Sequence, residues 1–317
     1  MAALPKAVVL FGASGFIGRN IKEKLKDQVE LLVGVNASGQ PVSGCALTVA
    51  VNALDSIPKL PPDTVIINVA AFRYFASRFG KQQAVILSNN VDLTNTIYSF
   101  ALERGITELR VASSSAVYPA DWKLLDDSVP LDLDAWPHAG EAAYAWSKRW
   151  GEVVAELWHR RLGISTISLR LSNPYGPFDT LDESEAHVAT AFVIRALSNV
   201  DEFEVRGDPY AERDFVFSGD VATAFIESLK LRGVQTSINC VSGHATQVIE
   251  LARIAMRAAG IDRPIRTKPP SVHANQSVKT RFATASRLRE IMPELPPFHG
   301  LDEGMRITMG WYRDALS

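Results

Sequence analysis

Apolar residues along this chain gather in short unbroken runs, and between these runs they recur at about every third or fourth position. A short unbroken run is typical of a strand buried on both faces of a parallel sheet, whereas the wider spacing is typical of an amphipathic helix. The runs occupy residues 6–11, 30–35, 64–71, 109–115 and 164–171, and the helical spacing occupies residues 15–27, 83–104 and 141–162. Strands that alternate with helices predict an α/β fold built on a doubly wound parallel sheet.

The alternation becomes less regular after residue 171, where loops rich in Pro, Gly and Asp separate short strands and helices. We therefore expect residues 1–171 to form the sheet domain and residues 172–317 to form mainly a smaller C-terminal lobe. Approximately residues 215–241 are expected to return to the sheet domain.

The composition narrows the classes of partner. The 317 residues are 47% hydrophobic and carry a net charge of −2 without a block of like charge, which predicts no nucleic-acid partner. No stretch approaches the roughly 18 apolar residues of a membrane span. The early run "AVVLF" is too short for a signal peptide. We therefore expect no membrane partner and a cytoplasmic location.

Cysteine and histidine usage is also sparse. Cys45 and Cys240 are the only cysteines, which is too few for a disulfide framework and fits a reducing cytoplasm. No CxxC pair and no clustered His/Cys spacing is present, so no metal site is expected.

A glycine-rich segment, "GASGFIG", joins the first predicted strand to the first predicted helix and supplies Gly12, Gly15 and Gly18. Glycines at this junction let the backbone turn tightly and approach a pyrophosphate, which the N-terminus of the helix then attracts. The context of strand, glycine loop and helix predicts a Rossmann-like domain that binds NAD or NADP.

The choice between the two cofactors depends on the end of the second strand. An acidic residue there commonly bonds the ribose 2′-hydroxyl, but this chain has Asn36. Asparagine bonds a hydroxyl and does not repel a 2′-phosphate, although no Arg or Lys follows in the loop to hold that phosphate. Both cofactors stay open, with a slight preference for NADP.

A second motif, "YAWSK", places Tyr144 four residues before Lys148 on a predicted helix, so the two side chains share one face. Alone this spacing is common. An ammonium beside a phenol favours the phenolate, however, and a tyrosine tuned in this way can serve as an acid/base near neutral pH.

In their order along the chain, these motifs resemble the short-chain dehydrogenase/reductase superfamily, and in particular its extended branch, the NAD-dependent epimerase/dehydratase family. Further segments are similar to those of that branch, and the resemblance extends from residue 6 to about residue 230. They are "NVAA" (68–71, with Asn68 in place of a histidine), "NNVDLTNTI" (89–97), "SSSAVYP" (113–119), "LRLSNPYGP" (169–177) and "RDFVFSGDVA" (213–222).

The resemblance implies roles for individual residues. Tyr144 is implied as the catalytic acid/base, Lys148 as its partner and ribose ligand, and Ser114 as the serine that bonds the substrate oxygen, counted back from Tyr118. The implied cofactor contacts are Gly12, Ser14, Gly15, Phe16, Ile17, Gly18, Asn36, Asn52, Ala70, Ala71, Asn90, Tyr144 and Lys148.

The same resemblance implies a nucleotide-sugar substrate. Asn173 and Arg213 align with residues near the sugar-nucleotide phosphates, and Arg281 is a weaker candidate of the same kind. His187 and Val188 follow a segment similar to that of the GDP-fucose synthases, in which the histidine is an epimerisation acid; for His187, a plain polar residue at a helix start is an equal alternative.

Two substitutions separate this chain from such relatives. The 4,6-dehydratases of the family have an Asp-Glu pair where this chain has Ser115 and Ala116, and the GDP-fucose synthases have a cysteine where it has Ala116. We therefore expect hydride transfer at the sugar C4 only, as an epimerase or a reductase. Reduction of a non-nucleotide ketone or aldehyde, and a non-catalytic NADP-binding redox sensor, are the alternatives.

The resemblance also implies a homodimer formed through a four-helix bundle that includes the helix at 141–162. The apolar stripe of that helix, Trp146, Trp150, Val153 and Leu157, lies opposite Tyr144 and Lys148. Plain core packing is an equal explanation of the stripe.

Overall fold

The computed structural model describes residues 3–72, 82–269 and 282–317. The strands of its large sheet are β1 (Ala7–Phe11), β2 (Leu31–Asn36), β3 (Leu47–Ala50), β4 (Val65–Asn68), β5 (Glu108–Ser114), β7 (Ser165–Leu171) and β11 (Thr236–Cys240). They run parallel in the order β11-β7-β5-β4-β1-β2-β3. The strand order reverses between β1 and β4, and doubly wound sheets bind ligands outside the carboxyl ends of the strands at such a reversal.

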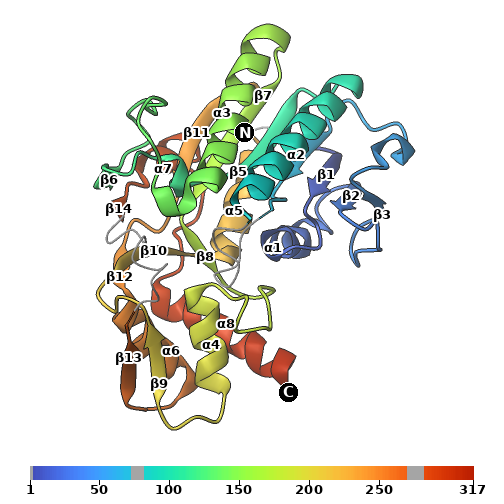
Figure 1. Cartoon of the computed structure of the whole chain (residues 1–317). Helices are drawn as coiled ribbons and strands as arrows, with labels where there is room; N and C mark the ends of the chain where they lie inside the picture. The colour runs from blue at the N-terminus through green and yellow to red at the C-terminus, as the bar shows by residue number, and fades with distance from the viewer. Residues whose placement is uncertain (1–2, 73–81, 270–281) are drawn as a thin grey trace.

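Helices cover both faces of this sheet because the strands are apolar on both sides. Val8 and Leu10 of β1 belong to one core cluster, and the alternate residues Val9 and Phe11 belong to another. The first face is covered by α1 (Phe16–Leu25) and α5 (Ser218–Ser228), and the second by α2 (Gln83–Glu103) and α3 (Ala142–Leu162). Figure 1 shows α2 and α3 side by side. The predicted doubly wound α/β fold is confirmed.

The smaller lobe has a core of its own (Figure 1). Its strands are β8 (Asn173–Tyr175), β10 (Glu212–Phe217) and β12 (Ala245–Gln247), which form one small sheet, and the parallel pair β9 (Phe203–Arg206) and β13 (Ile265–Lys268). Its helices are α4 (Val188–Leu197), α6 (Val248–Ala259) and α8 (Leu301–Leu316).

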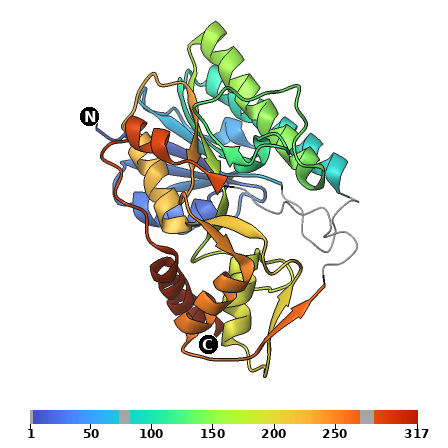
Figure 2. The same cartoon turned by 90° about the vertical axis from the view of Figure 1, so that its left-hand side faces the viewer.

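The chain passes between the two cores several times. It leaves the large sheet after β7, returns in α5 and β11, and leaves again for β12. The helix α7 (Ser286–Ile291) then contributes Leu288 to the core of the large sheet, whereas α8 contributes Met305 to the core of the lobe. Figure 2 shows α7 beside the sheet and α8, in dark red, in the lobe below. A short parallel pair, β6 (Leu124–Leu125) and β14 (Phe282–Ala283), lies against a third small cluster.

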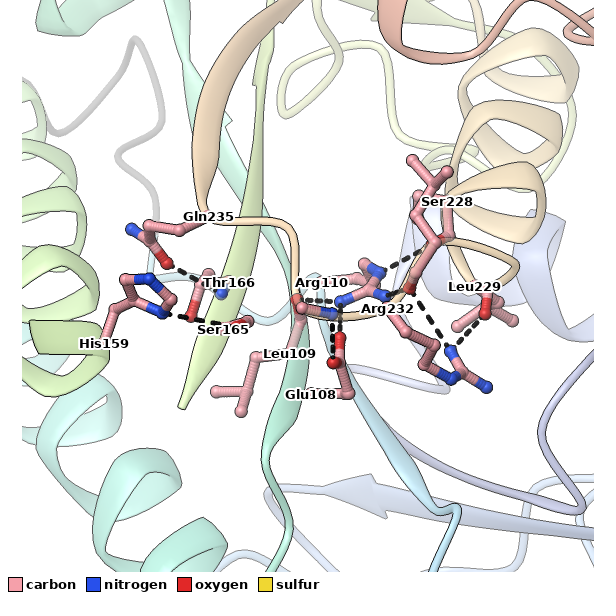
Figure 3. Close-up of polar contacts among 12 residues, drawn as sticks. Glu108, Leu109, Arg110, His159, Ser165, Thr166, Ser228, Leu229, Arg232 and Gln235 are labelled. Atoms are coloured by element: carbon pink, nitrogen blue, oxygen red, sulfur yellow. Dashed lines mark hydrogen bonds and ion pairs between the residues drawn. The ribbon is translucent and has the colours of Figure 1, made fainter. Parts of the chain in front are cut away.

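A fully buried arginine ties β5 to α5 at the amino end of the strand (Figure 3). The Arg110 Nε donates to the Ser228 carbonyl at 2.8 Å, and its Nη2 donates to the Leu231 carbonyl. The Glu108 carboxylate accepts from Arg110 Nη1 at 3.0 Å and from the backbone N–H of Gly233 at 2.7 Å. The guanidinium thus ties β5 to the C-terminal end of α5 and to the residues that follow it, where the Ser228 carbonyl also accepts from the backbone N–H of Leu231 at 3.1 Å.

The apolar stripe of α3 does not lie in the core of the described chain. Trp150 and Leu157 are 39% and 52% exposed, and Trp146 and Val153 are half-buried. The buried face of the helix is formed by Ala145, Ser147, Arg149, Val154 and Ala155. Plain core packing therefore does not account for Trp150 and Leu157.

Candidate active site

The glycine turn lies against the loop that follows β4. Gly12 has a φ of +86°, and its backbone N–H donates to the Val35 carbonyl at 2.8 Å. A Cβ atom on Gly12 would lie 2.7 Å from the backbone nitrogen of Ala70, so only glycine fits between β1 and β4 here. The turn therefore occupies the position at which the strand order reverses.

The first helix packs directly onto this turn. A Cβ atom on Gly18 would lie 1.9 Å from the Gly12 carbonyl oxygen, so α1 approaches the turn more closely than any side chain would allow. Gly15 is the N-cap residue of α1, and both it and Ser14 are exposed. Phe16 and Ile17 begin the helix and are half-buried. The backbone N–H groups of this first turn fit an anionic phosphate.

Asn36 stands at the carboxyl end of β2, as expected, but its amide is engaged in its own loop. The Asn36 Oδ1 accepts from the backbone N–H groups of Ser38 at 3.1 Å and of Gly39 at 2.6 Å. Its Nδ2 donates to the Gln40 carbonyl at 2.9 Å. The side chain thus closes an Asx-type turn and orients the loop beside the expected ribose position.

The other expected cofactor residues also lie at the carboxyl ends of strands. Asn52 is exposed in the turn after β3, and Ala70 and Ala71 follow β4. Asn90, in α2, is buried, and its amide exchanges hydrogen bonds of 2.9 and 2.8 Å with the backbone of Phe72. The Asn90 side chain therefore holds the loop that contains Ala70 and Ala71.

Lys148 is anchored to the sheet beside Tyr144. Its Nζ donates to the Ala112 carbonyl of β5 at 2.7 Å and lies 5.6 Å from the centroid of the Tyr144 ring. Burial lowers the pKa of Lys148 to about 8, and the nearby Glu152 carboxylate opposes this effect. The ammonium and the phenol are thus placed together by one turn of α3.

Ser114 ends β5, two residues beyond the anchor of Lys148. Its Oγ accepts from the backbone N–H of Ala116 at 3.1 Å, which caps the short 3-10 helix η3 (Ser115–Val117) and leaves the hydroxyl hydrogen able to donate. Ser113 instead donates to Glu152 at 2.6 Å. The structure therefore distinguishes the serines of this cluster.

The substrate candidates Asn173 and Arg213 belong to adjacent strands of the small sheet. The Asn173 Nδ2 donates to the Asp214 carbonyl at 2.9 Å, and the half-buried Arg213 donates from Nη1 to the Glu212 carbonyl at 2.7 Å. The buried Asp214 carboxylate accepts from Ser172 Oγ at 2.9 Å. These bonds fix β8 and β10 at the point where the chain enters the lobe.

His187 is the N-cap residue of α4, and its exposed ring lies near a buried carboxylate. The His187 Nδ1 is 3.4 Å from Asp179 Oδ2, which also accepts from Thr190 Oγ1 at 2.9 Å. Val188 packs against the core of the lobe. Arg281 lies outside the described residues.

Sequence reasoning missed Glu152 and Arg170. Arg170, in β7, donates to the Glu152 carboxylate from Nη2 at 2.7 Å and from Nε at 3.0 Å, and both side chains are largely buried. The available signal was the position of Glu152, four residues after Lys148 on the same helical face. Its partner lies in a strand that only the fold brings close.

The described residues offer neither a metal site nor a membrane span. In the described ranges, no group of three His, Cys, Asp or Glu side chains is arranged to hold a metal ion. No helix among the described residues is long and apolar enough to cross a membrane.

The turn of Gly12 against β4 places this chain among the dinucleotide-binding proteins with a doubly wound sheet. The sequence profile of the NAD dependent epimerase/dehydratase family matches residues 8–240. The chain belongs to this family, as its motifs predicted, and it is an enzyme of the extended short-chain dehydrogenase/reductase type.

Individual relatives are distant. The chain is 24% identical over 317 residues to GDP-mannose 3,5-epimerase 1 of Oryza sativa subsp. indica, an alignment that covers 98% of this chain and 82% of the relative. It is 25% identical over 324 residues to dTDP-4-dehydro-6-deoxy-D-allose reductase of a Streptomyces species, covering 97% and 96%. The structure of UDP-glucose 4-epimerase from Thermotoga maritima, solved with UDP-glucose, matches with a TM-score of 0.82 and 21% identity, covering 98% of this chain and 100% of that one.

Proposed function

We propose that this protein is an NAD(P)-dependent nucleotide-sugar epimerase or reductase that acts by hydride transfer at C4 of the sugar. The observation that carries the proposal is the position of the Lys148 ammonium, held by the Ala112 carbonyl and 5.6 Å from the centroid of the Tyr144 ring. A cation at this position stabilises the phenolate of Tyr144.

The residues divide the chemistry between them. Bound NAD(P) would supply the acceptor and donor of hydride. Tyr144 takes the proton of the C4 hydroxyl when the sugar is oxidised, and it returns a proton to the C4 oxygen when the ketone is reduced. Ser114 donates a hydrogen bond to the same oxygen and so orients it. An epimerase completes both steps in one turnover, whereas a reductase carries out the second step alone.

The cofactor is assigned to the first domain, residues 1–171 with the return at 215–241. The cradle made by Gly12 and Gly18, which a Cβ atom would fill, supports a pyrophosphate against the N-terminus of α1. Lys148 also bonds the nicotinamide ribose. NADP is slightly preferred over NAD because position 36 has no carboxylate to repel a 2′-phosphate.

The sugar nucleotide is assigned to the lobe at 172–317, with Arg213 and Asn173 near its phosphates and His187 and Val188 near its sugar. Arginine suits a diphosphate because its planar fork bonds two oxygens at once. The named activities of the relatives, all on nucleotide sugars, support this substrate class.

A homodimer through α2 and α3 belongs to the same proposal, as do a cytoplasmic location and a role in carbohydrate biosynthesis. Trp150 and Leu157 of α3 and Leu102 of α2 are exposed apolar side chains on these adjacent helices. A second copy would bury them as part of a four-helix bundle.

Two other reactions on nucleotide sugars are not assigned to this chain. A 4,6-elimination or a 3,5-epimerisation needs a base close to the reacting carbon, and Ala116 is buried and has only a methyl group. Reduction of a non-nucleotide carbonyl would not need Arg213, and a redox sensor would not need the pair Tyr144 and Lys148.

The test is a thermal-shift panel of UDP-, GDP-, CDP- and dTDP-sugars, each with NAD or NADP. A bound sugar nucleotide should stabilise the fold by about 2.7 kcal/mol at a hundredfold excess over its Kd. Stabilisation by a cofactor but by no sugar nucleotide would favour one of the two alternatives. The enzyme is then incubated in D2O with the nucleotide sugar that binds, and the product is examined by NMR or mass. Deuterium at C3 or C5, or release of a 4-keto-6-deoxy product, would contradict chemistry confined to C4.

A further inference from the structure

A buried acidic side chain lies directly behind the Tyr144 and Lys148 pair. Glu152 is one helical turn beyond Lys148 in α3, and its side chain is 9% exposed. Its carboxylate accepts two hydrogen bonds from the guanidinium of Arg170 and one from Ser113 Oγ at 2.6 Å. A carboxylate with three hydrogen-bond donors is rigidly held.

Glu152 and Lys148 line the same small cavity. The cavity has a volume of about 20 Å³, which is room for a single water molecule, and its wall also includes Ser113, Ser147 and Asn90. In this confined and partly buried space, the field of the carboxylate is screened less than it would be at the protein surface.

We propose that Glu152 is a positioning residue that keeps Lys148 protonated and, through Lys148, sets the proton affinity of Tyr144. The proposal rests on the proposed function of those two residues. Burial alone lowers the pKa of Lys148, and Glu152 is the charged group that counters this effect. Without Glu152, the ammonium would lose its proton more easily and the phenolate would lose its counter-charge.

Among the described residues, Glu152 is the charged group that acts on Lys148. Arg170 of β7 pairs with Glu152 and also donates to the hydroxyl of Tyr118, which follows η3. Arg149 is directed elsewhere, since its Nε donates to the Val117 carbonyl at 2.7 Å. On the α2 side, the cavity is lined by Asn90, Leu93 and Thr94, which carry no charge.

The sign of the effect on Tyr144 distinguishes this role from a direct one. A carboxylate acting directly on a phenol raises the phenol pKa, so its removal would lower that pKa. A carboxylate acting through the ammonium has the opposite effect, because its removal weakens the cation that stabilises the phenolate. The direction of the change therefore reports the route.

The test titrates Tyr144 itself and needs no substrate. Phenolate absorbance is followed against pH for the full-length protein saturated with NAD, and the same titration of a matched Tyr144→Phe protein is subtracted. Glu152→Gln should raise the pKa of Tyr144 by about one unit. Glu156→Gln removes a carboxylate one turn further along α3, where it pairs with Arg160 at the surface, and should leave the titration unchanged.

Three further variants secure the interpretation. In a Lys148→Met background, Glu152→Gln should no longer raise the pKa of Tyr144. The double variant Glu152→Gln with Arg170→Met removes both buried charges; it should recover stability relative to Glu152→Gln alone and still show the raised pKa. Glu152→Asp keeps the charge and should titrate close to the original protein.

An unchanged or lowered Tyr144 pKa in Glu152→Gln overturns the proposal. A return to the original pKa in the double variant does so as well, because Glu152 would then only neutralise Arg170. The titration tests only the coupling of Tyr144, Lys148 and Glu152, and its result does not depend on which reaction the enzyme catalyses. The proposed function is tested separately, because full turnover by Tyr144→Phe would contradict it.

Discussion

The Lys148 ammonium lies 5.6 Å from the centroid of the Tyr144 ring, one helical turn away in α3. The ammonium does not depend on the helix alone, because the Ala112 carbonyl of β5 accepts its hydrogen bond at 2.7 Å. The strand that anchors Lys148 is also the strand that ends at Ser114. The relative positions of all three proposed catalytic groups are therefore set by one strand and one helix.

Replacement of the tyrosine tests its proposed chemistry. Tyr144→Phe should bind the cofactor as before and lose turnover by about two to four orders of magnitude, since this is the usual contribution of a general acid/base. Tyr98→Phe is the control, because its hydroxyl is buried and shares a hydrogen bond of 2.9 Å with Thr166 Oγ1, outside the proposed site. Steady-state rates with the nucleotide sugar found in the panel decide the matter, and near-normal turnover by Tyr144→Phe would show the motif to be accidental.

The buried lysine predicts a pH-dependent cost in stability. Burial lowers the pKa of Lys148 from 10.5 to about 8, so the unfolded chain binds this proton more tightly than the folded protein. The free energy of unfolding from this group therefore rises with pH between those two values. Lys148→Met should stabilise the fold well below pH 8 and stabilise it less well above that pH. Urea unfolding, measured once well below pH 8 and once above it, gives the change in the free energy of unfolding that the substitution causes at each pH. Lys59 is exposed, so Lys59→Met should change the free energy of unfolding equally at the two pH values.

The cofactor preference is tested at the end of β2. Asn36→Asp keeps the acceptor for the N–H groups of Ser38 and Gly39 and loses the donor to the Gln40 carbonyl. The new carboxylate should shift the ratio of Kd values toward NAD by roughly tenfold, because it repels a 2′-phosphate. Asn36→Ser removes the amide without adding charge and is the control. An unchanged ratio in Asn36→Asp would mean that this side chain does not face the ribose.

Substitutions of Gly15 and Gly18, at the start of α1, should have different effects on stability and on binding. Gly18→Ala forces a methyl group onto the Gly12 carbonyl and should lower the free energy of unfolding by about 1–3 kcal/mol, the usual cost of overpacking. Gly15→Ala meets its nearest neighbour at 3.3 Å and should remain folded while it binds NAD more weakly, because the methyl group lies where phosphate approaches. Urea unfolding and calorimetric titration with NAD separate the effects. Equal stability losses in both variants would contradict this account.

The buried arginine should matter for folding and not for chemistry. Arg110→Met removes the guanidinium that bonds the Ser228 and Leu231 carbonyls and leaves the Glu108 carboxylate without its cation, so it should lower the free energy of unfolding by roughly 3 kcal/mol. The neighbouring Arg232, half-buried in the same corner, donates to the Leu229 carbonyl (Figure 3). Arg232→Met should therefore cost about 1 kcal/mol or less. Denaturant titrations compare the two, and a loss of NAD affinity in folded Arg110→Met would contradict a purely structural role.

The sequence predicted the elements whose signal is local. The helix expected at 83–104 runs over Gln83–Glu103, and the strand expected at 164–171 runs over Ser165–Leu171, because each has a continuous apolar pattern. The edge strand β3 was not predicted, since its four residues are mostly half-buried and its position depends on pairing with β2.

For the candidate site as well, the sequence indicated local features and not those that depend on long-range contacts. The spacing of Tyr144 and Lys148 is local, and the sequence therefore indicated the pair. The burial of Arg110 could not be inferred, because two of its acceptors, the Ser228 and Leu231 carbonyls, lie more than a hundred positions later in the chain. The pairing of Glu152 with Arg170 likewise depends on the contact between α3 and β7. The turn closed by Asn36 did have a local signal, the Ser-Gly that follows in "NASG".

The route of the chain between the two cores has a consequence for exchanging parts among relatives. Because α5 and β11 return to the large sheet, and α7 returns again before α8 enters the lobe, no single cut separates the two halves of the molecule. A chimaera joined at residue 171 alone would replace the edge strand β11 and the helix α5, which covers part of one sheet face, together with the lobe. Chimaeras that respect the fold need a junction at every crossing, so new specificity is more readily acquired by point substitutions and loop changes than by recombination of whole segments.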